Sequence, residues 1–396
     1  RVLLRRGLIL SLVDSLLAWS FLDALLVRYH LYDAARVYST ATLNKPPRIY
    51  IPSLFWNNEN VLHEFWSSNL LALTHALGPE NVYVSILESG SWDGSKAALR
   101  ELAQKLDDNG VARSVTREDR THADEIANAP AEAEGHPGWV KTPRRRIELR
   151  RIPYLAKLRN MSLRPLRELV KNGTTFDYVL FLGGVYFTVP DVIALINTNN
   201  GKYAAACALD FNAPPKYYDT FALRDAEGHG HPYFRSSKSR KAAKRSAPVP
   251  VRSCWNGMVI MPAATFQDGR LAFRGTDDTL AETHLEASEC CLVHADNPAS
   301  AEQGAWLNPN VRVGYSTHAY HQVHPSGGVW LSYWEIWLSL WKNRSYRWFT
   351  TPLLKERMCR SRQYQWEHAH PDRHEKGSFC LIDEMQVLVG NGWAHV

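Results

Sequence analysis

The sequence predicts an α/β fold with a mainly parallel sheet, and three observations support this. Apolar runs rich in β-branched and aromatic residues at 48–52, 81–87 and 178–182 have the length and composition of buried strands. Between them lie segments such as 61–77, whose apolar residues recur at helical spacing. Strands that alternate with helices form βαβ units and hence parallel sheets. At 396 residues and 45% hydrophobic content, the chain can bury a large core.

The first part of the chain predicts a membrane anchor. Residues 7–27 are a largely apolar stretch, long enough to span a bilayer, and the preceding arginines suit a cytoplasmic N-terminus. Asp14 and Asp23 interrupt the stretch, and a central Asp costs about 2.5–3.5 kcal/mol on insertion. A soluble or interfacial helix is therefore the alternative. We predict a signal-anchor helix at 1–28, a stem at 29–47, a catalytic domain at 48–328 and a Trp-rich extension at 329–396 packed on that domain.

The remaining elements follow from local signals. Helix 61–77 ends at Gly78-Pro79, and a second helix runs from Ser95 to Asn109-Gly110 before a strand at 111–116. Residues 121–138 lack periodicity, which predicts a loop. A predicted helix follows the arginine-rich segment 144–151 and runs to Val170. Further predictions are a helix from about Asp191, strands at 203–211 and 258–261, and an amphipathic helix at 330–349 near the domain or a membrane. The basic segment 235–245 predicts a mobile loop, with an anionic ligand as the alternative.

Charge and cysteine content narrow the class of protein. The net charge of +6 is mild, and the densest basic segment lacks interleaved aromatic residues, which argues against a nucleic-acid partner. None of the six cysteines has CxxC spacing, so a zinc site is disfavoured while disulfides are permitted. The sequons at Asn160, Asn172 and Asn343 agree with a secretory lumen.

Strand ends give the first candidate site residues, because ligands of open α/β sheets bind beyond the carboxyl ends of the strands. Strand 178–182 stops at Gly183-Gly184. Strand 81–87 is followed by 88–93, where small residues allow close backbone approach and a carboxylate can bind a ribose or base. The alternative is a turn before a helix, with Asp93 and Ser95 as caps. Asp210 stands at another strand end, where a turn or cap role is equally compatible.

Two further segments combine chemistry-bearing residues. Trp255, Asn256 and Gly257 offer a flat apolar face, an amide and room for close approach, which suits a sugar pocket or simply a tight turn. Segment 286–296 contains acidic and imidazole groups, which handle phosphates together with a hard cation. Its alternative is a surface helix followed by a strand. The sequence contains no Walker loop, GxSxG elbow, HExxH or GxGxxG motif.

Long stretches of the chain resemble a known family, the fungal capsule-associated α-1,3-mannosyltransferases (the cryptococcal type). The resemblance runs from about residue 48 to residue 320, with the final 392–396 also similar. The stretches that carry it are 84–93, 148–156, 203–211, 218–225, 253–257 and 288–296.

The resemblance implies a GT-A-like, Rossmann-type nucleotide-sugar fold in a single-pass type II Golgi membrane protein with a lumenal catalytic domain. It implies retaining α-1,3 transfer of mannose from GDP-mannose to a mannoside acceptor, with Mn²⁺ or Mg²⁺ as cofactor. The implied donor-binding residues are Glu88, Ser89, Gly90, Asp93, Gly183, Gly184 and Asp210. Trp255, Asn256 and Gly257 would form the sugar or acceptor pocket. Glu289 and Glu286 would be catalytic, and Asp210, His294 and Asp296 would bind the metal.

The chain departs from the family at one point. Where the family is expected to have Leu-Asn-Asp-Val, with the Asp binding metal, this chain has Leu182-Gly183-Gly184-Val185. Glycine supplies no carboxylate, and a cation that bridges two phosphates normally needs one. Two alternatives therefore stand beside the transferase: a non-catalytic or impaired member that binds a nucleotide sugar or glycan, and a transferase that uses another nucleotide sugar.

Overall fold

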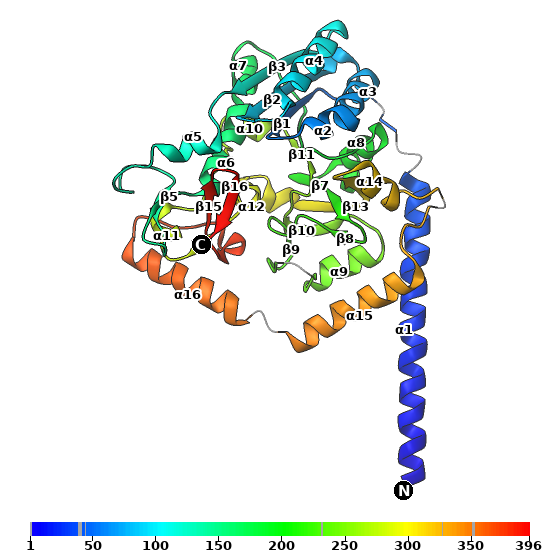
Figure 1. The fold of residues 1–396 in the computed structure, drawn as a ribbon. Coiled ribbons are helices and arrows are strands. Elements are labelled where there is room, and N and C mark those ends of the chain that lie inside the picture. The colour runs from blue at the N-terminus through cyan, green and yellow to red at the C-terminus, as the bar shows by residue number, and fades with distance from the viewer. Residues whose placement is uncertain (1, 39–41, 44, 231–232, 327, 351–352) are drawn as a thin grey trace.

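One mixed sheet forms the centre of the protein. The computed structural model describes residues 2–38, 42–43, 45–230, 233–326, 328–350 and 353–396. The strand order is β3-β2-β1-β6-β11-β7-β13-β10-β9, with β8 beside β7 (Figure 1). The strands are β1 Ile49–Phe55, β2 Val82–Ser89, β3 Ala112–Glu118, β6 Tyr178–Leu182, β7 Ala205–Ala213, β8 Lys216–Tyr217, β9 Arg224–Asp225, β10 Val249–Ser253, β11 Met258–Pro262 and β13 Ala305–Gly314.

Helices cover both faces of this sheet, and each face has its own core. One core contains side chains of α3 (Ser67–Leu77), α4 (Ser95–Asp108) and α8 (Val189–Ile196). The other contains side chains of α6 (Arg151–Ser162), α7 (Arg164–Lys171), α10 (Ala264–Gln267) and α12 (Glu289–Asp296). A short α2 (Glu59–Val61) and a π-helical turn (Leu62–Trp66) lead into α3. The arrangement is a three-layer α/β/α fold, so the α/β prediction is confirmed.

Strand β6 is buried on both faces. Leu180 and Leu182 enter one core, while Val179 and Phe181 enter the other. Strand β1 pairs in parallel with β2 on one side and with β6 on the other. The chain therefore builds outward through β2 and β3 and then returns to the opposite side of β1. Such a reversal opens a crevice at the carboxyl ends of the strands, where α/β proteins bind ligands.

Four local predictions need correction. The sheet is more mixed than predicted, because β11 is antiparallel to both of its neighbours. The predicted loop 121–138 contains helix α5 (His122–Ala127), which begins with a capping box between Thr121 and Asp124. The helix predicted up to Val170 is two helices, which meet at Leu163. The basic segment forms helix α9 (Ser237–Lys244), which packs on β10 rather than forming a loop.

The first helix extends further than predicted. Helix α1 runs over Val2–Tyr38 and includes the described start of the predicted stem, whose residues 39–41 and 44 lie outside the described residues. It projects from the rest of the chain (Figure 1), and Asp23 on it accepts hydrogen bonds from Lys244 (2.7 Å) and pairs with Arg344. Within the described residues, no helix combines the length and apolar character needed to cross a membrane. The predicted membrane anchor at 7–27 is therefore not supported.

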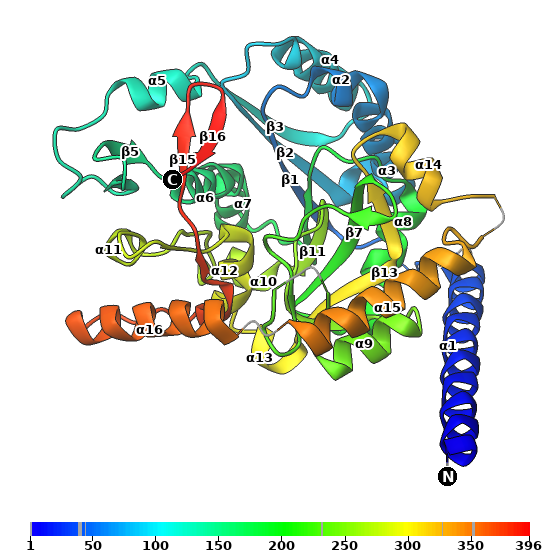
Figure 2. The ribbon, with the colours of Figure 1, turned by 60° about the horizontal axis from the view of Figure 1, so that its bottom comes forward.

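The C-terminal part lies along one side of the sheet domain. Helices α15 (Tyr333–Phe349) and α16 (Leu353–Ala369) run along that side, and hairpin β15–β16 (Gln386–Val389 and Gly392–His395) lies close to α5 and α6 (Figure 2). Disulfides join Cys207 to Cys254 and Cys291 to Cys380. The smaller elements are β4 Trp139–Lys141, β5 Ile147–Leu149, β12 Leu285–Glu286, β14 Ile382–Asp383, α11 Asp278–Ala281, α13 Ser300–Gln303 and α14 Thr317–Val323, with 3-10 turns at Pro79–Asn81, Thr198–Gly201 and Ser378–Cys380.

Candidate active site

A cleft of about 540 Å³ opens at the carboxyl ends of β1 and β6. Its floor includes Leu54 of β1, Leu182 of β6 and the two glycines that follow β6. Helix α6, the segment 255–257, the start of α12 and hairpin β15–β16 form the walls. The cleft therefore occupies the crevice that the sheet topology creates.

The glycines after β6 allow two backbone segments to meet. The amide of Gly183 donates to the carbonyl of Gly257 at 2.9 Å, and the carbonyl of Gly183 accepts from Trp66 Nε1 at 2.9 Å. Gly257 has a φ of +75°, and a Cβ there would lie 2.9 Å from Val185. By contrast, a Cβ at Gly184 would meet no atom closer than 3.4 Å. A Cβ at position 184 therefore makes ordinary van der Waals contacts with Val61, Asn58 and Phe55.

The predicted sugar-pocket residues are divided between the cleft wall and its support. Trp255 and Gly257 line the cleft, whereas Asn256 is fully buried behind them with a φ of 48°. The amide nitrogen Nδ2 of Asn256 donates to Asp210 Oδ1 and to the carbonyl of Asp219, both at 3.1 Å. The segment is thus a tight turn that also presents Trp255 to the cleft.

Helix α6 contributes a cationic wall. Arg151, Leu155 and Arg159 stand four residues apart, so one face of the helix lines the cleft. Arg151 donates to Gln386 Oε1 at 2.5 Å, and its guanidinium lies 4.0 Å from the ring centre of Trp393. Both of these partners are uncharged. The nearby carboxylates of Glu289 and Glu384 attract the guanidinium of Arg151, which lines the cleft.

Glu289 lies in the cleft as an ionised carboxylate. Its Oε1 accepts from Arg159 Nε at 2.8 Å, and the guanidinium of Arg159 also lies 4.6 Å from the ring centre of Trp255. Burial acts to raise the pKa of Glu289, but the charge and hydrogen bond of Arg159 outweigh it and lower the pKa. The predicted catalytic position of Glu289 is therefore compatible with the geometry.

Glu286 has a structural role instead of the predicted catalytic one. It is fully buried outside the cleft lining, and its two oxygens accept from Arg150 Nη2 at 2.7 Å and Nε at 3.1 Å. Arg150 is also fully buried and donates to Asp278 at 2.6 Å. A buried guanidinium needs such carboxylates to compensate for its lost hydration. Glu286 therefore neutralises Arg150 and lies outside the lining of the cleft.

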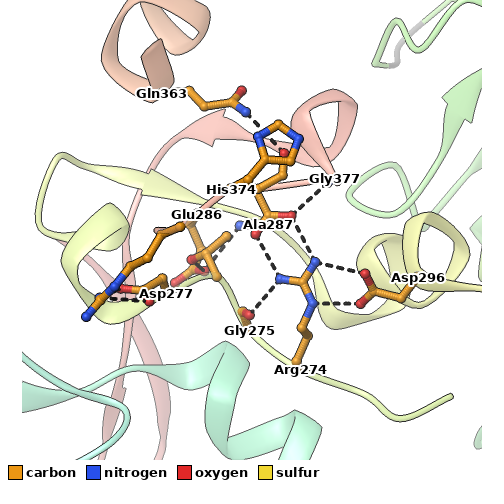
Figure 3. A network of polar contacts seen from close by, with 12 residues as sticks. Arg274, Gly275, Asp277, Glu286, Ala287, Asp296, Gln363, His374 and Gly377 are labelled. Carbon is orange, nitrogen blue, oxygen red and sulfur yellow. Dashed lines mark hydrogen bonds and ion pairs between the residues drawn. The ribbon is translucent and has the colours of Figure 1, made fainter. Parts of the chain in front are cut away.

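The predicted metal ligands do not come together. Asp296 accepts two hydrogen bonds from Arg274, which also pairs with Glu375 (Figure 3). His294 Nε2 donates to the carbonyl of Cys254 at 2.6 Å, and burial lowers the pKa of His294 to about 4. Asp210 is fully buried and accepts from Tyr315 at 2.9 Å. Each predicted ligand is held by a different partner, so the set does not fit a divalent cation.

One group within the described residues has the spacing of metal ligands, namely Cys207, Cys254 and His294. The two cysteines form a disulfide, however, which removes the thiolates that would bind a metal. At the end of β6, the two glycines offer no carboxylate. No step of the chemistry below is therefore assigned to a metal ion.

Asp219 is a cleft residue that no sequence motif singled out. It lines the cleft, and its amide donates to Asp210 Oδ1 at 3.1 Å. Burial, together with repulsion from Asp210, raises the pKa of Asp219 to about 6. The available signal was its place in stretch 218–225, which carries the family resemblance.

The constellation after β2 forms a turn outside the cleft lining. Asp93 accepts from the amides of Glu59 (3.1 Å) and Ser95 (3.0 Å), and the buried Glu88 accepts from the amide of Ser91. Gly90 has a φ of +65°, and a Cβ there would lie 2.0 Å from a neighbouring carbonyl. Ser89 lines a side pocket of about 140 Å³ next to the cleft. Asp93 thus acts as a cap, and Glu88 and Gly90 lie outside the lining of the cleft.

The C-terminal hairpin supplies a wall that no sequence motif indicated. Gln386, Trp393 and His395 line the cleft together with Glu384, which lies just before the hairpin. His395 Nδ1 lies 2.7 Å from Glu384 Oε1. The familial appearance of 392–396 was the available signal. It gave no indication that these residues return to a cleft built mainly from the first 320 residues.

Comparisons with known proteins agree with the sequence resemblance. Residues 48–296, more than half of the chain, match the family model described as Cryptococcal mannosyltransferase 1. The α-1,3-mannosyltransferase CMT1 of Cryptococcus neoformans var. neoformans serotype D is 27% identical in an alignment of 271 positions, which covers 63% of this chain and 53% of that protein. The chain thus spans about half the length of this curated relative.

Two solved structures show a weaker similarity. The mannosyltransferase PcManGT from Pyrobaculum calidifontis, in complex with GDP-Man and Mn²⁺, has a TM-score of 0.38 and 13% identity, covering 93% of this chain and 88% of that chain. GalNAc-T7 with UDP, GalNAc and Mn²⁺ has a TM-score of 0.40 and 13% identity, covering 68% of this chain and 43% of that one. The family match itself is extensive and contains most of the cleft. This chain belongs to the Cryptococcal mannosyltransferase 1 family.

Proposed function

We propose that this chain is a GT-A-type glycosyltransferase that transfers mannose from GDP-mannose to a mannoside acceptor, in α-1,3 linkage and with retention of configuration. The observation that carries the proposal is the cleft at the β1–β6 crevice, which holds arginines, a carboxylate and an aromatic face together. Most of it lies within the family-matching residues 48–296. These groups match the needs of glycosyl transfer, namely an anionic leaving group, a cationic sugar ring and an acceptor proton.

The diphosphate of the donor is met by the arginines of α6. Arg151 and Arg159 present guanidinium groups, whose planar donor geometry matches phosphate oxygens. As the bond between the anomeric carbon and the phosphate oxygen breaks, negative charge grows on the diphosphate. Positive charges that are already in place stabilise that change.

The carboxylates serve the sugar and the acceptor. Glu289, kept ionised by Arg159, stabilises the positive charge that develops on the mannose ring. The acceptor oxygen attacks the anomeric carbon on the face that the diphosphate leaves, which retains the α configuration. Asp219, with a pKa of about 6, is mostly ionised at pH 7 and can take the hydroxyl proton. Trp255, with the guanidinium of Arg159 against its ring, forms the adjoining part of the cleft wall.

A second candidate function is favoured by the glycines after β6. Gly183 and Gly184 occupy the place of the family's expected metal-binding pair, and the cleft has no carboxylate there. A member that binds a nucleotide sugar without turnover would retain the cleft and its arginines but lack the cation-assisted departure of the diphosphate.

Calorimetry and a transfer assay distinguish the candidates. GDP-mannose should bind the wild-type chain with or without Mn²⁺, because arginines meet the diphosphate, and labelled mannose should pass to an α-mannoside. Binding without any transfer would support the second candidate. Tighter binding of a UDP-sugar than of GDP-mannose would instead support a transferase with another donor.

We also propose that the folded part acts in the Golgi lumen. The two disulfides suit an oxidising compartment, because such bonds are rare in reducing ones. Of the three sequons, Asn172 has an exposed side chain at the end of α7. Occupied glycosylation at Asn172 in a eukaryotic host tests this location.

A further inference from the structure

A second, larger cavity adjoins the cleft and is not used by the proposed chemistry. Its volume is about 790 Å³, and it lies between the segment 220–230, helix α16 and the segment 378–384. Thr220, Phe221 and Glu384 line both this cavity and the cleft. The two spaces are therefore neighbours that share the Thr220–Phe221 edge.

The edge between the two spaces is built rigidly. The buried guanidinium of Arg224 donates to the carbonyls of Phe221 and Phe379, both at 2.9 Å, and to that of Cys380 at 3.1 Å. The disulfide between Cys291 and Cys380 fixes the same segment to α12, at the side of the cleft. Both spaces therefore share a preorganised edge, which lowers the entropic cost of binding one ligand across them.

The chemistry of the cavity matches a neutral polyhydroxylated chain. Lys355 and Arg360 line it together with Glu227 and Glu367, so both signs of charge are present and neither a polyanion nor a polycation is favoured. Tyr364 stands on its α16 wall with 62% of its surface exposed. An aromatic face of this kind attracts the C–H groups of a pyranose ring, while the charged groups around it accept or donate hydrogen bonds to hydroxyls.

The size of the cleft gives the reason for such an extension. Its volume of about 540 Å³ lies within the range of about 300–1,000 Å³ that a single small-molecule ligand occupies. A donor that fills the cleft leaves room for the acceptor sugar at its edge and not for the sugars behind it. The neighbouring cavity supplies that room.

We propose that the cavity between the Thr220–Phe221 edge and α16 binds the part of the acceptor that lies behind the sugar being modified, so that the preferred acceptor is a neutral oligosaccharide of three or more units. This inference rests on the proposed function, since it takes the cleft as the place of transfer. It adds α16, which lies outside the family-matching residues, to the substrate-binding surface.

The test compares acceptor length in wild type and Tyr364→Ala. With saturating GDP-mannose, wild-type kcat/KM should rise by about tenfold or more from methyl α-mannoside, which fits the cleft alone, to a mannotriose, and Tyr364→Ala should remove that gain while leaving methyl α-mannoside within about twofold. Tyr364→Phe should behave as wild type, because it keeps the ring. Tyr32→Ala is the matched control, since Tyr32 is 52% exposed on α1, away from both cavities. Equal losses for both acceptors, or no length dependence in wild type, would overturn the proposal.

A binding measurement separates this inference from the proposed function. Saturation-transfer NMR with mannotriose and GDP detects occupation of the cavity without turnover. If wild type binds mannotriose and Tyr364→Ala does not, the proposed acceptor site in the cavity is supported even where no mannose is transferred. In that case only the proposal of mannose transfer fails. Equal mannotriose signals from the two proteins would refute acceptor binding in this cavity, whatever the transfer assay gives.

Discussion

Glu286 of β12 and Glu289 of α12 are assigned different roles, the first structural and the second catalytic. Replacing each of them by glutamine tests this assignment. Glu286→Gln removes the charge that neutralises Arg150, a guanidinium with no exposed surface. Breaking a buried ion pair costs about 3–5 kcal/mol. Asp278, 2.6 Å from Arg150, still pairs with it, and the glutamine oxygen can still accept a hydrogen bond. We therefore expect a loss of about 2–4 kcal/mol in unfolding free energy.

Glu289→Gln should have the opposite profile. Its partner Arg159 has a side chain 20% exposed at the cleft wall, so water can replace part of the lost interaction. Glu289 itself is only 3% exposed, but the glutamine oxygen can still accept from Arg159, so we expect a stability loss of about 1–2 kcal/mol, with transfer slowed by about 100-fold or more. Urea unfolding followed by tryptophan fluorescence measures the first quantity, and initial rates of mannose transfer measure the second.

The refuting result is specific. If Glu286→Gln unfolds at the wild-type urea concentration and yet loses transfer, Glu286 acts on the substrate and the ion-pair assignment is wrong. If Glu289→Gln keeps wild-type rates, the cleft carboxylate has no part in the chemistry. A variant of Glu286 that is unstable but active below its unfolding transition supports the ion-pair assignment of Glu286.

Three further predictions follow from single positions. Gly184→Asp should make GDP binding depend on Mn²⁺, which should tighten it by about tenfold or about 1.4 kcal/mol, because a Cβ at 184 meets nothing closer than 3.4 Å. Gly183→Asp is the control, since its Cβ would lie 3.1 Å from a carbonyl. Equal Mn²⁺ responses of the two variants in calorimetry would contradict this prediction. The folded pKa of His294, about 4, lies below its unfolded value near 6.5, so the unfolded chain binds the proton first as the pH falls. The unfolding free energy of wild type should therefore drop by up to about 3 kcal/mol relative to that of His294→Gln between pH 6.5 and pH 4. Parallel stability–pH curves of the two proteins from urea unfolding would disprove this. On secretion from a eukaryotic host, Asn172→Gln should lose a glycan that a gel shift detects, and Asn160→Gln should not. The side chain of Asn160 is hydrogen-bonded to both backbone groups of Phe273 and so is not free to carry a glycan. A glycan at Asn160 would argue against the fold around it.

Much of the fold could be predicted because its signals are local. Strand β6 was recognisable from five apolar residues bounded by Gly183, and such a run is buried on both faces of a sheet. Helix α9 was mistaken for a loop because its residues are basic and polar. Its helix is stabilised by packing on β10, a contact that no local pattern announces.

The site was predicted in part for the same reason. Gly183, Trp255 and Glu289 line one cleft, and the strand ends and familial stretches that contain them were visible in the sequence. His294 and Asp296 were grouped with Glu289 because they are close in sequence. On a helix, however, five residues turn the side chain by about 140°, and seven residues advance it by about 10 Å along the axis. Closeness in sequence therefore did not bring them into one ligand set.

Long-range contacts explain what was missed. Glu286 was judged by its charge alone, since its buried partner Arg150 is 136 residues away. Trp393 was unassigned because nothing near it in the sequence predicts that it covers Arg151. A single sequence carries the composition of such residues but not their pairing.

The hairpin wall of the cleft has a consequence for biosynthesis. Leu54 and Trp393 line the same cleft, although they are 339 residues apart in the chain. At about 5–20 residues per second, a ribosome needs roughly 20–70 s to make the intervening stretch. During that time the apolar floor of the cleft is open to other nascent chains. The wall that Trp393 places against Arg151 therefore forms only after nearly all of this sequence has been made.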